Sequence, residues 1–130
     1  MPHVAPHGRL GDSGGMQDLA EFRTRLRAFV AERDWDRFHS PKNLAMALSV
    51  EAAELVELFQ WLTEAETDAL DGDRRRRAAA ELADVLWFLV RIADRLDIDL
   101  LAAAEAKFAE NEAKYPAERV RAQSKKYSEY

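Results

Sequence analysis

Apolar residues recur at spacings of three and four along most of the chain, and this period constrains the fold more than any other feature. Near the start, Leu19, Phe22, Leu26 and Phe29 follow the spacing, with Glu and Arg between them. Such a pattern predicts an amphipathic helix. No segment shows convincing strand alternation, and no Asn-Gly or Asp-Gly hairpin joins two alternating runs. The sequence therefore predicts an all-α fold.

Local signals place the ends of the helices. Ser40 followed by Pro41 is a helix start, because the hydroxyl can cap the helix and proline is tolerated at its first position. Asp97 or Asp99 is expected to cap the last helix, which must end before Pro116. The segments DWDRFHS and TEAETDALDGD lack the period and are interpreted as connections. Four main helices are expected, over about residues 16–33, 41–62, 74–96 and 100–115.

The composition indicates one globular domain. At 130 residues there is room for a single modest core, which we place in residues 16–130. Residues 1–15 hold four of the five glycines and are predicted to be a flexible tail. No apolar run is long enough to span a membrane, so we expect a soluble protein, and the absence of cysteine fits the cytoplasm. The net charge of -5 argues against a nucleic-acid polymer as partner.

Four carboxylates stand where helices are otherwise apolar. In the second predicted helix, Glu51 falls inside the leucine face, and Glu54 lies about 60° from it. Glu81 repeats this feature in the third helix, with Asp84 three residues later. Residues three apart project from one helix face, so two facing antiparallel helices would direct all four carboxylates into one space.

Burying several ionised carboxylates is costly unless something neutralises them, and a cation is the simplest answer. An all-oxygen set suits Mg²⁺ or Mn²⁺, whereas a di-iron bundle normally supplies a histidine three residues after a glutamate, which neither helix has. A second interpretation leaves these residues at the helix edge in salt bridges. It is favoured for Asp84 taken alone, which shares its side with Arg77, Arg91 and Arg95. Glu57 continues the spacing but lies toward the helix boundary. It is interpreted either as a solvated residue or as a residue that supports the metal ligands without binding the metal.

The spacing ExxE, then 26 residues, then ExxD resembles the signature of the all-α nucleotide pyrophosphohydrolases of the MazG-like superfamily. It lies among further blocks that resemble, in order, the subgroup containing the dCTP pyrophosphatases. The resemblance covers about residue 19 to the end of the chain. Its blocks are ERDWDRFHSPKN, EAAELVELFQWL, ELADVLWFLVRIADRLDIDL, KFAENEAKYP and SKKYSEY.

The resemblance implies an enzyme that hydrolyses a nucleoside triphosphate, dCTP or a modified dCTP among the candidates, to the monophosphate and pyrophosphate. In such a role it would clear non-standard or excess nucleotides. It also implies that Glu51, Glu54, Glu81 and Asp84 hold Mg²⁺. Either Glu51 or Glu54 is then the catalytic base as well as a ligand. The four-helix bundle would be completed as a homodimer or homotetramer.

Further positions match residues that contact the nucleotide in relatives. Aromatic side chains at Trp35 and Trp61 suit stacking on a base, with ordinary packing as the competing interpretation. Two departures put selectivity for cytosine in question, because Phe88 replaces a tyrosine and Leu26 a histidine of the vertebrate enzymes. The expected substrate-binding residues are Trp35, His39, Trp61, Phe88, Lys107 and Asn111.

Two other functions remain open at the level of sequence. One is a helical interaction module, in which the carboxylates meet basic residues of a partner and no catalysis takes place. The other is a related phosphohydrolase acting on diphosphates or on phosphoribosyl nucleotides. The apolar residues almost all round the second and third helices favour self-association in either case.

Overall fold

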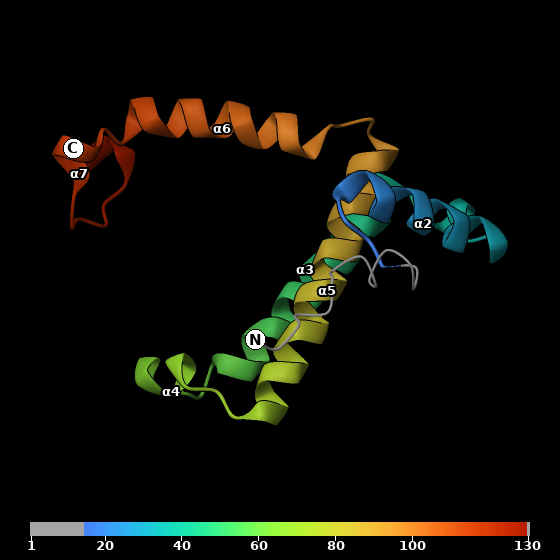
Figure 1. The fold of residues 1–130 in the computed structure, drawn as a ribbon, viewed down its shortest axis with the longest axis horizontal. Helices are drawn as coiled ribbons and strands as arrows, with labels where there is room; N and C mark the ends of the chain where they lie inside the picture. The colour runs from blue at the N-terminus through green and yellow to red at the C-terminus, as the bar shows by residue number, and fades with distance from the viewer. Residues whose placement is uncertain (1–14, 130) are drawn as a thin grey trace, which may run out of the picture. The chain divides into compact units, whose positions relative to one another are not determined.

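The computed structural model describes residues 15–129, and these residues contain helices and no strand. The predicted all-α class is therefore confirmed, while the predicted tail lies outside the described residues except for Gly15. Figure 1 shows the helices in chain order. They are α2 (Leu19–Glu32), the 3₁₀ turn η1 (Asp36–Phe38), α3 (Pro41–Phe59), α4 (Glu64–Asp68), α5 (Gly72–Arg95), α6 (Leu100–Lys114), α7 (Ala117–Val120) and the 3₁₀ turn η2 (Tyr127–Glu129).

The four main helices begin at capping side chains. The Ser40 hydroxyl accepts a hydrogen bond from the Asn43 backbone N–H at 3.1 Å, and Pro41 is the first helical residue, as the sequence predicts. Of the two candidate caps for α6, Asp99 is the one used, and its carboxylate accepts from the Ala102 N–H at 3.1 Å. Aspartates also cap α2 and α5. These side chains satisfy backbone donors that a helix start leaves unpaired.

One predicted connection contains a helix. Within residues 63–73 the chain forms α4, a single turn that was expected to be irregular. A reciprocal pair of hydrogen bonds holds its start: the Glu66 N–H donates to the Thr63 hydroxyl at 3.2 Å, and the Thr63 N–H donates to the Glu66 carboxylate at 3.1 Å. This capping box stabilises a turn too short to show an apolar period. The polar end of the chain likewise includes α7.

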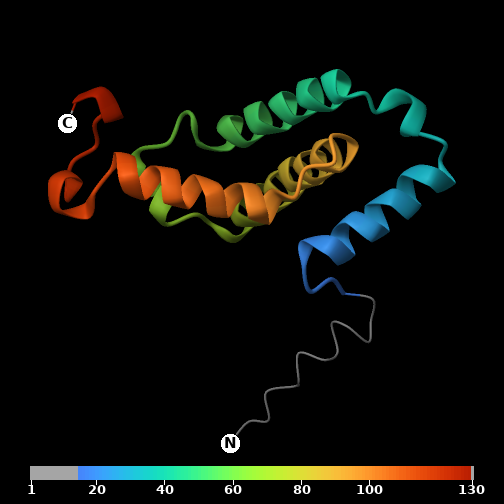
Figure 2. The same cartoon turned by 90° about the horizontal axis from the view of Figure 1, so that it is seen from above.

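Helices α3 and α5 lie side by side and run antiparallel, as Figures 1 and 2 show. The buried residues of the two helices include Leu44 and Leu58 in α3 and Ala78 and Val90 in α5. Helix α2 packs on α5 as well. The antiparallel direction matters because it sets which residues of the two long helices come opposite one another.

Trp87 anchors α2 on α5. Its ring meets the edges of Phe22 and Phe29, with centroids 6.1 Å and 5.0 Å away. Leu26 and Val30, on the same side of α2, are buried at 2% and 1% exposure. The apolar face of the first helix thus packs against α5, as the apolar period predicts.

The chain divides into two compact units, one ending at Leu96 and the other beginning at Asp97. The first holds α2 to α5, and the second holds α6 and α7. No residue of α6 is buried. Among the described residues, none of the helices has the length and apolar character required to cross a membrane.

Candidate active site

Two carboxyl groups meet inside the α3–α5 contact. Glu51 projects from α3 and Glu81 from α5, each within the apolar face of its helix. The Oε2 atom of each is fully buried and has no hydrogen-bond partner. A buried polar atom without a partner normally costs stability, so these two oxygens are the anomaly of the fold.

A third carboxylate completes a compact oxygen cluster. One oxygen each from Glu51, Glu81 and Asp84 lies within 4.8 Å of the other two. Glu54 stands beside them, close enough to interact with both Glu51 and Glu81. Helical spacing explains the arrangement, because residues three apart on α3 face residues three apart on α5.

The crowding disfavours negative charge. Burial, followed by the neighbouring Glu54 carboxyl and then the charge of Asp84, raises the pKa of Glu51 from 4.5 to about 7. Burial and Glu54 also raise the pKa of Glu81. Both directions follow from like charges sharing a poorly hydrated space. Without a cation, the cluster therefore retains a proton close to neutral pH.

The salt-bridge interpretation of Asp84 is wrong for the described part of the chain. No described basic side chain forms an ion pair with Asp84, and Arg91 and Arg95 instead bind Asp36. Glu57, which continues the spacing on α3, is exposed.

The residues present fit a divalent cation. The donor set is entirely carboxylate oxygen, which hard cations prefer. The two buried oxygens lack any other partner, and a cation would satisfy both while removing the repulsion that raises the glutamate pKa values. Glu51, Glu81 and Asp84 form the set best placed to hold it, with Glu54 adjacent.

The predicted nucleotide-binding residues of the first unit are not core residues. Trp61 is 86% exposed and Trp35 is 44% exposed, so neither side chain belongs to the buried core of this chain. Trp35 touches the edge of Phe29 at 5.7 Å between centroids, and His39 lies 6.5 Å from Trp35. Phe88 is partly buried in α5. Their contacts with a nucleotide stay predictions.

Lys107 and Asn111 lie four residues apart on α6, and both are exposed. The Lys107 ammonium pairs with Glu110 at 3.1 Å, and Lys114 binds the same carboxylate at 2.7 Å. The lysine that is predicted to bind phosphate, Lys107, therefore has a solvent-exposed ion-pair partner of a kind that contributes little to stability. Its contact with phosphate stays a prediction.

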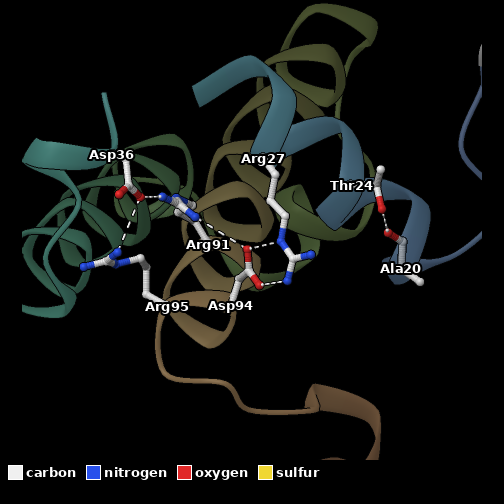
Figure 3. Close-up of polar contacts among 7 residues, drawn as sticks. All are labelled: Ala20, Thr24, Arg27, Asp36, Arg91, Asp94 and Arg95. Atoms are coloured by element: carbon white, nitrogen blue, oxygen red, sulfur yellow. Dashed lines mark hydrogen bonds and ion pairs between the residues drawn. The ribbon is translucent and has the colours of Figure 1, made fainter. Parts of the chain in front are cut away.

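Sequence reasoning missed a charged cluster near the C-terminal end of α5. It is centred on Arg91, which is only 5% exposed and binds Asp36, His39 and Asp94. Figure 3 shows its contacts with Asp36 and Asp94. The available signal was an arginine inside the apolar run VLWFLVRIAD, where a charge needs partners. Asp94 is three residues further along the same helix, but nothing local in the sequence identifies the two distant partners, Asp36 and His39.

Comparisons with known proteins agree with this geometry. A model of the MazG-like family matches residues 46–130. The dCTP pyrophosphatase 1 of Homo sapiens is 43% identical, over 92% of this chain and 79% of the human protein. That of Rattus norvegicus is 42% identical, over 85% of this chain and 66% of the rat protein.

Among solved structures, a pyrophosphatase from Archaeoglobus fulgidus superposes with a TM-score of 0.73 at 37% identity. The match covers 78% of this chain and 94% of the archaeal one. The carboxylate spacing, the helical fold and the three comparisons lead to the same result. This chain belongs to the MazG-like family.

Proposed function

We propose that the chain is a metal-dependent nucleoside triphosphate pyrophosphohydrolase that converts dCTP, or a modified dCTP, to the monophosphate and pyrophosphate. The observation that carries the proposal is the pair of buried, unpartnered oxygens of Glu51 and Glu81 within a cluster of carboxylates. Relatives named dCTP pyrophosphatase 1, 41–43% identical, support the choice of substrate. The cellular role would be removal of unwanted nucleotides, and the cytoplasmic location stays a prediction.

Glu51, Glu81 and Asp84 would hold Mg²⁺, with Mn²⁺ as the substitute of similar chemistry. When bound, the cation neutralises phosphate oxygens and makes a nearby water more acidic. Glu54 is adjacent to these three ligands but does not belong to the group whose oxygens lie within 4.8 Å of one another. This position suits Glu54 to accept a proton from the attacking water. Glu54 can also act as a fourth metal ligand, because the spacing of the carboxylates does not distinguish a ligand from a general base.

In the proposed reaction, the oxygen of a water molecule forms a bond to the α-phosphorus. The bond from that phosphorus to the bridging oxygen of the β-phosphate breaks, and pyrophosphate leaves with the electron pair. The proton of the water passes to a carboxylate, which we assign to Glu54. No covalent intermediate with the protein is needed.

Base recognition would involve Trp35, His39, Trp61 and Phe88. The exposed indole faces of Trp35 and Trp61 suit stacking. Phe88 can stack but cannot hydrogen-bond to a base edge. Lys107 and Asn111 are proposed to bind phosphate oxygens.

The assembly is proposed to be a homodimer or homotetramer. Helices α3 and α5 expose Val50, Val56 and Leu82, each more than half exposed, on a pair that elsewhere forms the core. A second copy would cover this apolar surface and complete the bundle. Sedimentation as a stable monomer at the protein concentrations used in the activity assays would contradict this part of the proposal.

The direct test is a panel of deoxynucleoside and ribonucleoside triphosphates, with and without Mg²⁺, in which the phosphate products are separated. Monophosphate and pyrophosphate in equal amounts are expected, with dCTP or a modified dCTP preferred. Glu51→Gln and Glu81→Gln should abolish turnover, whereas Glu57→Gln, a change on the exposed side of α3, should not.

The same panel separates the alternatives. Turnover of diphosphates or phosphoribosyl nucleotides, but not of triphosphates, would indicate the related phosphohydrolase. Folded protein that neither binds Mg²⁺ nor releases any product would indicate the interaction module.

A further inference from the structure

The Arg91 guanidinium is held by groups from two parts of the chain. Its Nη2 atom binds Asp36 in η1, and its Nη1 lies 3.5 Å from Asp94, one turn further along α5. Its Nε–H donates to Nδ1 of His39 at 3.1 Å. Figure 3 shows the guanidinium between the two aspartates. Arg91 thus ties the loop before α3 to α5.

Two further arginines bind the same aspartates. Arg27 of α2 forms two hydrogen bonds to the Asp94 carboxylate, one of them 2.8 Å from Nε to Oδ2. Arg95 approaches Asp36 at 3.4 Å. The three guanidinium groups and two carboxylates have a net charge of +1. Because the Arg91 and Asp94 side chains are only 6% and 9% exposed, the cluster should be rigid.

The contact with His39 fixes the state of that ring. Arginine only donates hydrogen bonds, so Nδ1 must be the acceptor and carries no proton. The proton of a neutral ring is then on Nε2, which becomes a donor. Burial, and then the positive charge of Arg91, lowers the pKa of His39, and these effects outweigh the opposing effect of Asp36. The lowered pKa favours the neutral ring.

The free side of the ring lies in the region expected to bind the nucleotide. Among described residues, none forms a hydrogen bond with Nε2 of His39. The ring lies beside Trp35, which is 44% exposed, and immediately before the Ser40 cap of α3. The positive cluster behind it favours a ligand with electron-rich oxygens.

We propose that Arg91 is a positioning residue, which holds His39 with Nδ1 as acceptor so that Nε2–H is presented as a donor to an acceptor oxygen of the nucleotide. This inference rests on the proposed function. The oxygen belongs either to the base carbonyl or to a phosphate, and both offer the same chemistry to Nε2–H. Arg91 itself makes no contact with substrate in this scheme.

The state of the ring can be read by NMR in protein labelled with ¹⁵N-histidine. The chain has three histidines, and His39→Gln identifies the signals of His39. In the full-length wild-type protein around neutral pH, the Nδ1 signal should be that of an unprotonated nitrogen and the Nε2 signal that of a protonated one. A proton on Nδ1, or rapid exchange between the two forms, would overturn the proposal.

Ligand titrations test whether the Nε2–H of His39 donates a hydrogen bond to the nucleotide. A non-hydrolysable dCTP analogue with Mg²⁺ should shift the Nε2–H signal while Nδ1 stays unprotonated. Deoxycytidine alone should reproduce the shift if the acceptor is the base carbonyl, and pyrophosphate alone if it is a phosphate oxygen. An Nε2–H signal unchanged by all three ligands would overturn the proposal even if dCTP is hydrolysed.

Variants separate positioning from general structural support. Arg91→Met should mix the two ring forms and raise KM about tenfold, with a smaller change in kcat, and Arg91→Lys should restore part of the loss. Arg27→Met removes a member of the same cluster that does not touch His39, and it should leave the ring state and KM unchanged. If Arg91→Met does not fold, the wild-type spectrum and titrations decide.

These measurements do not depend on turnover. If no triphosphate is hydrolysed but the ring has the stated form and Nε2–H responds to nucleotide, the proposed reaction fails and the positioning role stands. If dCTP is hydrolysed but the proton of His39 is on Nδ1, the proposed reaction stands and the positioning role of Arg91 fails.

Discussion

Glu51 and Glu81 meet across the α3–α5 contact, and each has one oxygen that is buried without a hydrogen-bond partner. The pair weakens the fold unless protons or a cation neutralise it. The stability of the protein should therefore report directly on the occupancy of the site.

Adding Mg²⁺ should raise the melting temperature of the wild-type protein. At a free concentration a hundred times Kd, binding adds about 2.7 kcal/mol to the free energy of unfolding, an increase of several degrees in Tm. Glu81→Gln should lose most of this gain, and Glu57→Gln should keep it. The measurement is a thermal scan with and without metal, and equal gains for all three proteins would place the cation elsewhere.

The metal-free protein should become less stable as pH rises from about 4.5 to 7. The pKa of Glu51 is raised in the folded state to about 7, so folding is favoured while the carboxyl is protonated and this contribution is lost as it ionises. Urea unfolding in the presence of a chelator measures the effect. Glu51→Gln should flatten this part of the curve, and saturating Mg²⁺ should reverse the trend, because protons and cation compete for the site.

Asp94→Asn should destabilise the first unit by about 2–4 kcal/mol, because it leaves the two arginine partners of Asp94, the buried Arg91 and the more exposed Arg27, facing a neutral amide. The exposed pair Arg76–Asp73 is the matched control. Asp73→Asn should change stability by less than about 0.5 kcal/mol. Denaturant unfolding of both variants checks the contrast, and equal losses would mean that the Arg91 cluster contributes no more than a surface pair.

Trp61→Ala should affect binding and not folding. Its side chain is 86% exposed, so the change in stability should be within about 0.5 kcal/mol, while KM for dCTP should rise about tenfold through lost stacking. Trp87→Ala is the opposite case, because its ring packs against Phe22 and Phe29, and it should cost about 3–5 kcal/mol. Steady-state kinetics and thermal unfolding of both variants distinguish the roles, and unchanged KM in Trp61→Ala would remove this residue from the base pocket.

Ser40→Ala should reduce the free energy of unfolding by about 1 kcal/mol, because the hydroxyl caps the α3 N-terminus. Ser49→Ala is a suitable control, since that hydroxyl only donates to the Met46 carbonyl within the same helix. Chemical denaturation measures both, and similar values would show that the cap is not important for α3.

The features that could be predicted from sequence are those with local causes. The start of α3 follows from Ser40 and Pro41, and the inward position of Glu51 follows from helical phase. The Arg91 cluster could not be predicted, because Arg27 and Asp94 are 67 residues apart and meet only through tertiary packing. Asp84 was ambiguous for the same reason, since helix periodicity places arginines on its side without showing that they bind Asp36 instead.

Helix α6 has 15 residues and none of them is buried. A helix of this length is only marginally stable by itself in water. Lys107 and Asn111 therefore belong to a segment whose order depends on what it contacts. The proposed phosphate binding by these residues and the proposed association of the protein would then be thermodynamically linked, so the apparent affinity for nucleotide should increase with protein concentration.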